Sequence, residues 1–243
     1  MAGARAEVQI LEKEPGDAEL SFTEKGILLK SKGSFPVLVT SVVLKVSPGT
    51  PVSVRSSFGN VTIRGICGVP KITVCASQGR ISLKDLREIV SLEASSDQGE
   101  IELASSASLG EAPLRTDLAK ITVKGIQGAK SLSVESTNGN IVVKDVQGAQ
   151  VLSITTDGDI EVKQAQVGSQ LSARSQRKIL VEGSSAPEAD LEQSSYGSGV
   201  VLRRSTFGRL KVRVTGGGDI RCVGTTYQSK DFQAEHGRVI ESK

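Results

Sequence analysis

The chain has 243 residues and a formal net charge of +3, with acidic and basic residues interspersed along its length. This balance is too mild to indicate nucleic acid or an anionic membrane as a partner. Aromatic residues make up only 3% of the chain and there is no Trp, so a core built from large rings is not expected. No apolar run approaches the roughly 20 residues that a membrane-spanning helix requires.

Residues 1–13 lack the apolar central region of a secretory signal, and we therefore expect an intracellular protein, either cytoplasmic or organellar. The three cysteines, Cys67, Cys75 and Cys222, cannot all pair with one another. None lies in a CxxC or Cys/His cluster, so neither a metal site nor a cofactor is expected. Reduced thiols are favoured over a disulfide framework, and Cys222 is predicted to point into the core.

The first fifty residues follow no fixed period. Strands are predicted at residues 6–11, 19–22, 26–29 and 37–46, with turns at Pro15-Gly16 and Pro48-Gly49. The repeats that follow would expose unpaired backbone and apolar side chains at their first end, which promotes end-to-end association. We therefore interpret residues 1–50 as N-terminal capping strands and residues 51–243 as a repeat domain, within one structural domain.

The repeat has a period of about twenty residues. Each copy has a glycine, or a residue in its place, followed two positions later by Val or Ile. A fixed period of this length indicates one structural unit that is copied and stacked. The marker positions are Gly59, Gly79, Gly99, Ala119, Gly139, Gly158, Arg177, Ser198, Gly218 and Gly237.

Each repeat contains two short segments in which apolar and polar residues alternate, a pattern typical of β-strands. The marker glycine between them is predicted to supply the positive φ of a sharp corner. A third, weaker segment closes several repeats. The pattern predicts an all-β fold, a single-stranded parallel β-helix (solenoid) of about ten coils of roughly 20 residues, stacked about 4.8 Å apart. A run of antiparallel hairpins is the alternative.

The segment from Val52 to Val61 has the form V-x-V-x-[ST]-x-x-G-x-[IV], and a closely similar unit runs from Leu132 to Ile141. With the apolar strand and Pro turn before it, this unit resembles an adhesin-like parallel β-helix family of bacterial and eukaryotic repeat proteins. The resemblance covers about residues 40–243. It implies a β-helix of roughly twenty-residue coils, and it implies no catalytic residues because the family shares no catalytic motif.

Catalysis on polysaccharides by a β-helix would need carboxylates in the same column of adjacent coils. In the column directly after the marker positions, no two neighbouring residues are acidic. His236, the only histidine, is predicted to be a solvated terminal residue rather than a general base. The stretch Gly216-Gly217-Gly218 lacks the Lys-Ser/Thr of a phosphate loop and is predicted to form a corner. We therefore expect a non-enzymatic protein, and a carbohydrate-active enzyme is the least supported hypothesis.

One column carries a more uniform charge. At the end of the second strand, most coils have a basic residue, and these residues would form a ladder along one edge of the solenoid. Such a basic ladder would suit a polyanion, a glycan or an acidic partner, whereas basic residues at strand ends also act as solubilising positions. Its members are Arg64, Lys84, Lys124, Lys144, Lys163 and Arg203.

A uniform repeat without an assembled site favours a rigid scaffold or protein-interaction module, such as a subunit or accessory factor of a larger assembly. The expected partner is another protein. Binding of a polyanion or glycan by the basic ladder is the alternative, and nucleic acid is not expected.

Overall fold

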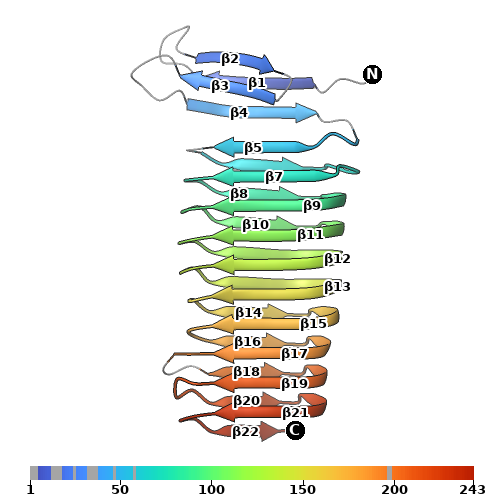
Figure 1. Cartoon of the computed structure of the whole chain (residues 1–243), viewed down its shortest axis with the longest axis vertical. Helices are drawn as coiled ribbons and strands as arrows, with labels where there is room; N and C mark the ends of the chain where they lie inside the picture. The colour runs from blue at the N-terminus through green and yellow to red at the C-terminus, as the bar shows by residue number, and fades with distance from the viewer. Residues whose placement is uncertain are drawn as a thin grey trace.

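The computed structural model describes residues 48–56, 59–195 and 199–243, together with the backbone of four strands between residues 5 and 45. The described residues form strands and no helix. From β5 onward the strands wind repeatedly around one long axis (Figure 1). The predicted Pro15-Gly16 turn and the marker residue Ser198 lie outside the described residues.

The N-terminal part contains four strands in two antiparallel pairs. Strand β1 (Arg5–Leu11) pairs with β4 (Leu38–Lys45), and β2 (Ala18–Thr23) pairs with β3 (Gly26–Ser31). These strands correspond to the four that the sequence predicts in residues 1–50. Their role as a cap depends on side chains outside the described residues and stays a prediction.

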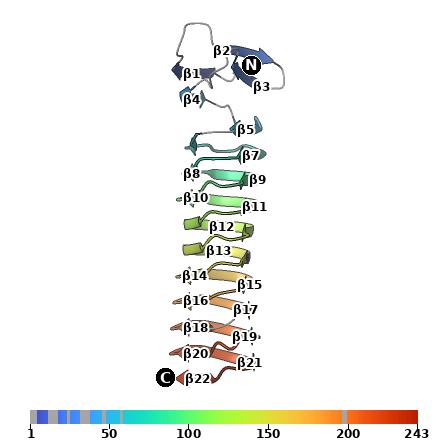
Figure 2. The ribbon, with the colours of Figure 1, turned by 90° about the vertical axis from the view of Figure 1, so that its left-hand side faces the viewer.

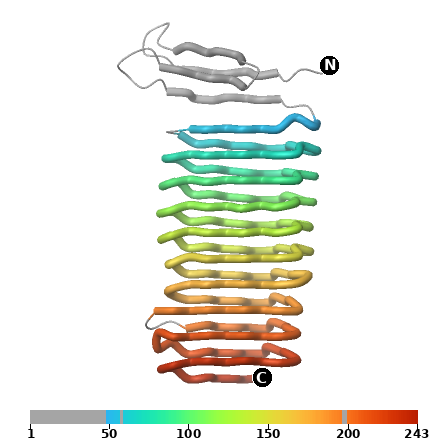
Figure 3. The backbone as a smooth tube through the Cα atoms, viewed as in Figure 1, coloured from blue at the N-terminus to red at the C-terminus, as the bar shows by residue number. Residues whose placement is uncertain are grey.

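The other eighteen strands form one sheet that winds as a solenoid of about nine turns, close to the ten that the sequence predicts (Figure 3). Every pairing between its successive coils is parallel, which excludes the run of antiparallel hairpins. The strands are β5 (Val52–Ser56), β6 (Val61–Arg64), β7 (Lys71–Ala76), β8 (Ile81–Lys84), β9 (Arg87–Ser96), β10 (Ile101–Ala104), β11 (Ala107–Thr116), β12 (Ile121–Ser136), β13 (Ile141–Thr156), β14 (Ile160–Lys163), β15 (Gln166–Ser175), β16 (Ile179–Glu182), β17 (Ser185–Gln193), β18 (Val200–Arg203), β19 (Thr206–Val214), β20 (Ile220–Val223), β21 (Thr226–Ala234) and β22 (Val239–Ser242).

Each coil has two broad sides and a short third side. Figure 2 shows the broad sides as two facing layers, with β8, β10, β14 and β16 in one layer and β7, β9, β11 and β15 in the other. The third side is the bend that leads from the first layer into the second. In β12 and β13 a single 16-residue strand runs through all three sides, so the backbone stays in β conformation around most of the coil.

The core lies between the two layers and consists of stacked aliphatic side chains. Ile121, Ile141 and Ile160 lie in register on consecutive coils and are at most 1% exposed. One apolar cluster extends in this way from Val52 to Cys222. Cys222 is buried as predicted, and burial together with the Glu241 carboxylate raises the pKa of its thiol to about 11. Cys67, Cys75 and Cys222 are all free thiols.

The marker glycines are explained by close packing more than by backbone conformation. Gly59 and Gly79 have positive φ, as predicted, but Gly99, Gly139 and Gly158 do not. A Cβ added to Gly139 would lie 1.7 Å from the carbonyl oxygen of Ala119 in the preceding coil. The prediction of positive φ is therefore wrong at these three corners, where glycine is needed because the backbones of two coils approach closely.

Positive φ occurs instead at the corner that follows the first layer. Asp85, Ser105, Gly125, Asp145 and Gln164 occupy equivalent places there, with φ between 50° and 64°. Non-glycine residues in this conformation carry a strain of roughly 1–2 kcal/mol each, which the surrounding sheet has to offset. Small polar residues with local hydrogen-bonding capacity tolerate it best, which accounts for the Asp and Ser residues at this corner.

A column of buried hydroxyls joins the marker corners of successive coils. The Ser136 hydroxyl accepts a hydrogen bond from the N–H of Gly139 (2.8 Å) and donates one to the carbonyl of Ala119 in the preceding coil (3.0 Å). Thr156 repeats this arrangement between its own Gly158 N–H and the Gly139 carbonyl. The hydroxyl column satisfies polar backbone groups that the solenoid would otherwise bury without a partner.

Replacing Ser136 by Ala should therefore destabilise the solenoid. The Ser136→Ala variant leaves one buried N–H and one buried carbonyl without this partner, and we expect a loss of about 1–3 kcal/mol in the free energy of unfolding. Denaturant titration measures this loss. Ser133→Ala is the matched control, because Ser133 is on the same strand and faces outward. Equal effects of the two substitutions would contradict the structural role of the hydroxyl column.

The same substitution at two glycines separates close packing from positive φ. Gly139→Asn should cost about 1–3 kcal/mol, because the new side chain collides with the preceding coil. Gly125→Asn should cost less than about 1 kcal/mol, because Asn tolerates positive φ. An added Cβ at Gly125 would come no closer than 3.7 Å to another atom. The free energies of unfolding of both variants distinguish close packing from positive φ as the reason for each glycine. A Gly139→Asn variant as stable as the wild-type protein would refute the packing argument.

Candidate functional site

The basic ladder exists as one column of the first layer. Arg64 lies in register with Lys84, Lys124 with Lys144, and Lys144 with Lys163. Arg203 follows after Glu182, which interrupts the column as Ala104 does between Lys84 and Lys124. The structure thus brings all six predicted residues to one edge of the rod.

Carboxylates of the same or a neighbouring coil pair with most of this ladder. Arg64 pairs with Asp85 (2.8 Å) and Lys84 with Glu102 (3.2 Å). Glu161 lies within 3.3 Å of the Lys144 ammonium and 2.7 Å of the Lys163 ammonium. Within the described part of the chain, Lys124 and Arg203 are the ladder members that form no ion pair. Asp85, directly after Lys84, is visible in the sequence as an acid beside the ladder. Glu102 and Glu161, two positions before the ladder column on their own strands, are not apparent when one column is read at a time.

The pKa of Glu161 reflects its contacts with two lysines of the ladder. Hydrogen bonds and charge from Lys163 and then Lys144 outweigh partial burial and lower the pKa of the Glu161 carboxyl. The same contact raises the pKa of Lys163. Glu161 and Lys163 are therefore both charged near neutral pH, and Glu161 is shared between Lys144 and Lys163.

A polar hollow lies beside the ladder on the first coils. It has a volume of about 310 Å³ and is lined by Asn60, Thr62, Arg80, Ser82, Lys84 and Glu102. Burial acts to raise the pKa of Glu102, but Lys84 and Arg80 outweigh it and hold the pKa below its ordinary value. Arg80 approaches the Glu102 carboxylate to 2.6 Å. The cations of this hollow are thus already engaged with a carboxylate of the chain itself.

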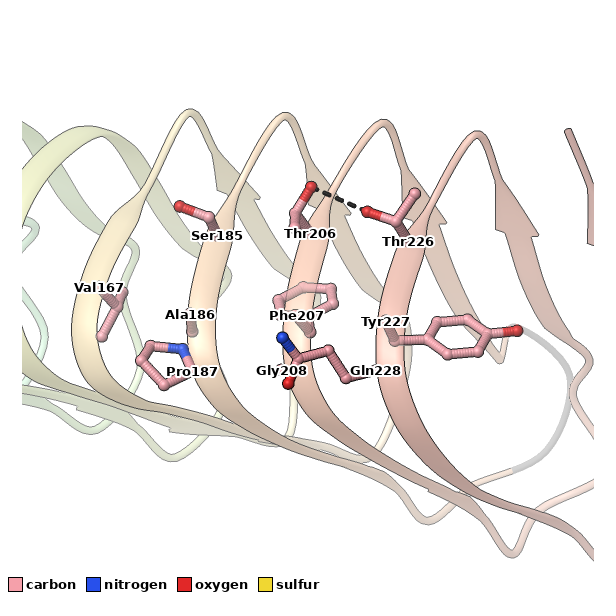
Figure 4. A pocket seen from close by; sticks show the side chains of 10 residues that line it. All are labelled: Val167, Ser185, Ala186, Pro187, Thr206, Phe207, Gly208, Thr226, Tyr227 and Gln228. Carbon is pink, nitrogen blue, oxygen red and sulfur yellow. Dashed lines mark hydrogen bonds between the residues drawn. The ribbon is translucent and has the colours of Figure 1, made fainter.

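A larger groove of about 400 Å³ lies on the third side of the late coils. Figure 4 shows Ser185, Thr206 and Thr226 in a row on three successive coils, with Phe207 beside them and the Tyr227 ring extending along the rod. The Thr226 hydroxyl donates to the Thr206 hydroxyl (3.0 Å). The lining residues are Val167, Ser185, Ala186, Pro187, Thr206, Phe207, Gly208, Thr226, Tyr227 and Gln228.

This third-side groove forms where the repeat becomes shorter. Gln166 and Gln170 are in register with Ser185 and Glu188, so the third side loses one residue between these two coils. The outward-facing positions of this side are occupied by Pro187 and Gly208, which extend little beyond the backbone. A Cβ on Gly208 would lie 2.6 Å from the carbonyl oxygen of Pro187, so the two coils are tightly apposed there. The sequence analysis missed the groove, although the shortened repeat is visible in the sequence.

The C-terminal end of the core is closed by polar groups. Lys230 and Glu241 are in register with the buried residues Leu210 and Cys222, so they take inward positions of the last coil. Their side chains form an ion pair of 2.5 Å, and the Tyr227 hydroxyl donates to Glu241. The Tyr227 and Phe232 rings meet edge to face at 5.7 Å. This polar end cap shields the last apolar layer and agrees with the charged terminus that the sequence shows.

The carboxylates at the corners of the solenoid have structural contacts. Within the described residues, no group of three His, Cys, Asp or Glu residues could hold a metal ion. Asp159 and Asp219 accept backbone hydrogen bonds from Lys178 and Arg238 of the following coils, so these carboxylates stabilise corners. Over the same part of the chain, no helix has the length and apolar character needed to cross a membrane.

The profile of the Toastrack DUF4097 family matches residues 21–239, which is most of the chain. The chain therefore belongs to the Toastrack DUF4097 family. This assignment agrees with the resemblance to β-helix repeat proteins, and its description assigns no adhesive role. Comparison with the curated proteins and with the solved structures gave no match.

The pairing of the ladder predicts how a variant should behave on a polyanion matrix. Glu161→Gln removes the carboxylate that Lys144 and Lys163 share, so we expect elution from immobilised heparin at a higher salt concentration. Glu135→Gln is the control, because it removes the same charge from a different surface, where Glu135 pairs with Arg115 (3.3 Å). Equal shifts for both variants would show that net charge, and not the ladder, controls retention.

Proposed function

We propose that the chain is a non-enzymatic, rigid β-solenoid that serves as a scaffold or protein-interaction module. The observation that carries this proposal is the continuous core, because Val, Ile, Leu and Ala side chains fill the inside of coil after coil. Groups capable of chemistry are thereby confined to the outer surface. Both hollows described above are open depressions of that surface, which suits docking better than the enclosure of a reacting substrate.

The rigidity of the rod also supports a scaffold. Parallel in-register pairing continues from β5 to the last strand, and each coil contacts mainly its two neighbours. Such a body keeps its surface features at fixed positions without needing to rearrange. A partner that binds it therefore meets a preformed surface.

Binding of a polyanion or glycan through the basic ladder is the second candidate. The in-register column favours it, as do Lys124 and Arg203, which form no ion pair with any described residue. Its weakness is the set of carboxylates that already engage Arg64, Lys84, Lys144 and Lys163. It requires a binding constant that falls steeply with salt and is lost in a Lys124/Lys144/Lys163→Glu variant.

The interaction role is tested by quantitative affinity purification of the tagged chain from its native source after chemical cross-linking. We expect at least one protein to be recovered in near-stoichiometric amount with the folded chain. A Leu152→Asp variant is the control, because a charge at this fully buried position should unfold the solenoid and release any specific partner. Recovery of the same proteins with both variants, or of none with the folded chain, would overturn the proposal.

A further inference from the structure

One coil of the solenoid differs from all its neighbours in charge. Between Gln193 and Gly218 the chain has five basic residues and no acidic residue, although acids and bases are interspersed elsewhere. The coils on either side contain carboxylates, for example Glu188 and Asp190 before it and Asp219 and Asp231 after it. Positive charge is thus concentrated around one turn of the rod. The five residues are Arg203, Arg204, Arg209, Lys211 and Arg213.

This basic coil passes through the middle of the third-side groove. Thr206, Phe207 and Gly208 supply the central part of the lining. Arg203 comes before these three residues in the same coil and Arg209 follows them directly, although neither lines the groove itself. Both arginines are exposed. Among the described residues neither forms an ion pair, although Glu182 is in register with Arg203 and Glu188 with Arg209.

The floor of the groove is apolar and its rim is polar. Phe207 is 1% exposed and continues the buried column of Val167 and Ala186. These three side chains are almost completely buried, so the apolar surface that stays accessible in the groove comes from the exposed Pro187 and the half-buried Tyr227. The row of Ser and Thr hydroxyls offers hydrogen bonds along one rim. A ligand that fits must therefore combine negative charge with at least one apolar group.

We propose that the third-side groove docks a short, extended, acidic peptide segment of a partner protein. One aliphatic or aromatic side chain of that segment lies in the groove against Pro187 and Tyr227, and flanking carboxylates pair with Arg203 and Arg209. Planar guanidinium groups suit carboxylates because they can bind them in a bidentate manner. This inference rests on the proposed interaction function and names the chemistry of the partner.

A uniform polyanion fits this groove less well than a peptide does. Lying along the rod, it would leave the basic coil and meet Glu188 on one side and Asp231 on the other, with repulsion at both. It would also leave the accessible apolar surface of Pro187 and Tyr227 without a partner. A short segment with acidic residues on both sides of one apolar residue can cover that surface and place its carboxylates along the basic coil, which is why we select a peptide as the occupant.

Selection of a random peptide library displayed on phage against the intact protein tests the proposal. We expect the enriched peptides to carry Asp or Glu on both sides of a Leu, Ile or aromatic residue. Synthetic versions of these peptides should bind on the order of tenfold or more weaker to an Arg203→Glu/Arg209→Glu variant and to Thr206→Trp, which fills the groove. Arg177→Glu/Lys178→Glu is the control with the same charge change at an exposed corner of another coil.

The variants should unfold at the same denaturant concentration as the wild-type protein, which confirms that the fold is intact. Enrichment of uncharged or basic peptides, or of none, would overturn the proposal, as would equal loss of affinity in the control. If a native partner is still recovered with the Arg203→Glu/Arg209→Glu variant, the groove is not the docking site but the interaction function stands. If no partner is recovered with the wild-type chain, the interaction function itself fails.

Discussion

Parallel, in-register hydrogen bonding between coils is the constraint on which the rest of the structure depends. Each residue lies directly above its counterpart one coil earlier, at sequence separations of 19 to 21 residues. Apolar side chains can be buried only if every coil places them in the same columns, and the backbone groups at each corner must find partners in the next coil. The stacked aliphatic core and the buried hydroxyl column both follow from this one requirement.

The fold could be predicted from the repeat because parallel, in-register pairing places residues that are one period apart in the same column. The spacing of Ile121, Ile141 and Ile160 was sufficient to predict the core, and the alternation around them predicted the strands. The reason for each corner glycine was harder to predict. Gly139 and Gly125 look alike in sequence, yet one is required by the approach of a neighbouring backbone and the other adopts positive φ. A single sequence does not distinguish these two reasons, because the contact of Gly139 is with another coil.

Contacts between coils also limited what the sequence could predict about the candidate binding surfaces. The basic residues do form one column, but Glu102 and Glu161 approach it from positions two residues before that column on their own strands. A reading of one column at a time does not include them. The groove arises from a local departure from the period, the shortened third side at residues 185–188. Fitting all repeats to one common period does not reveal such a local change in length. In a solenoid the regular positions therefore reveal the architecture, whereas the irregular ones determine where grooves form on the surface.

Each coil adds the same length to the rod, so the number of coils sets the distance between surface features on different coils. The polar hollow occupies the first coils and the third-side groove the last ones, and one continuous apolar core runs between them. Insertion or deletion of one whole coil would change their separation by about 4.8 Å while leaving each local surface intact. Changes in distance between two bound molecules could thus be achieved in discrete steps, without redesign of either contact.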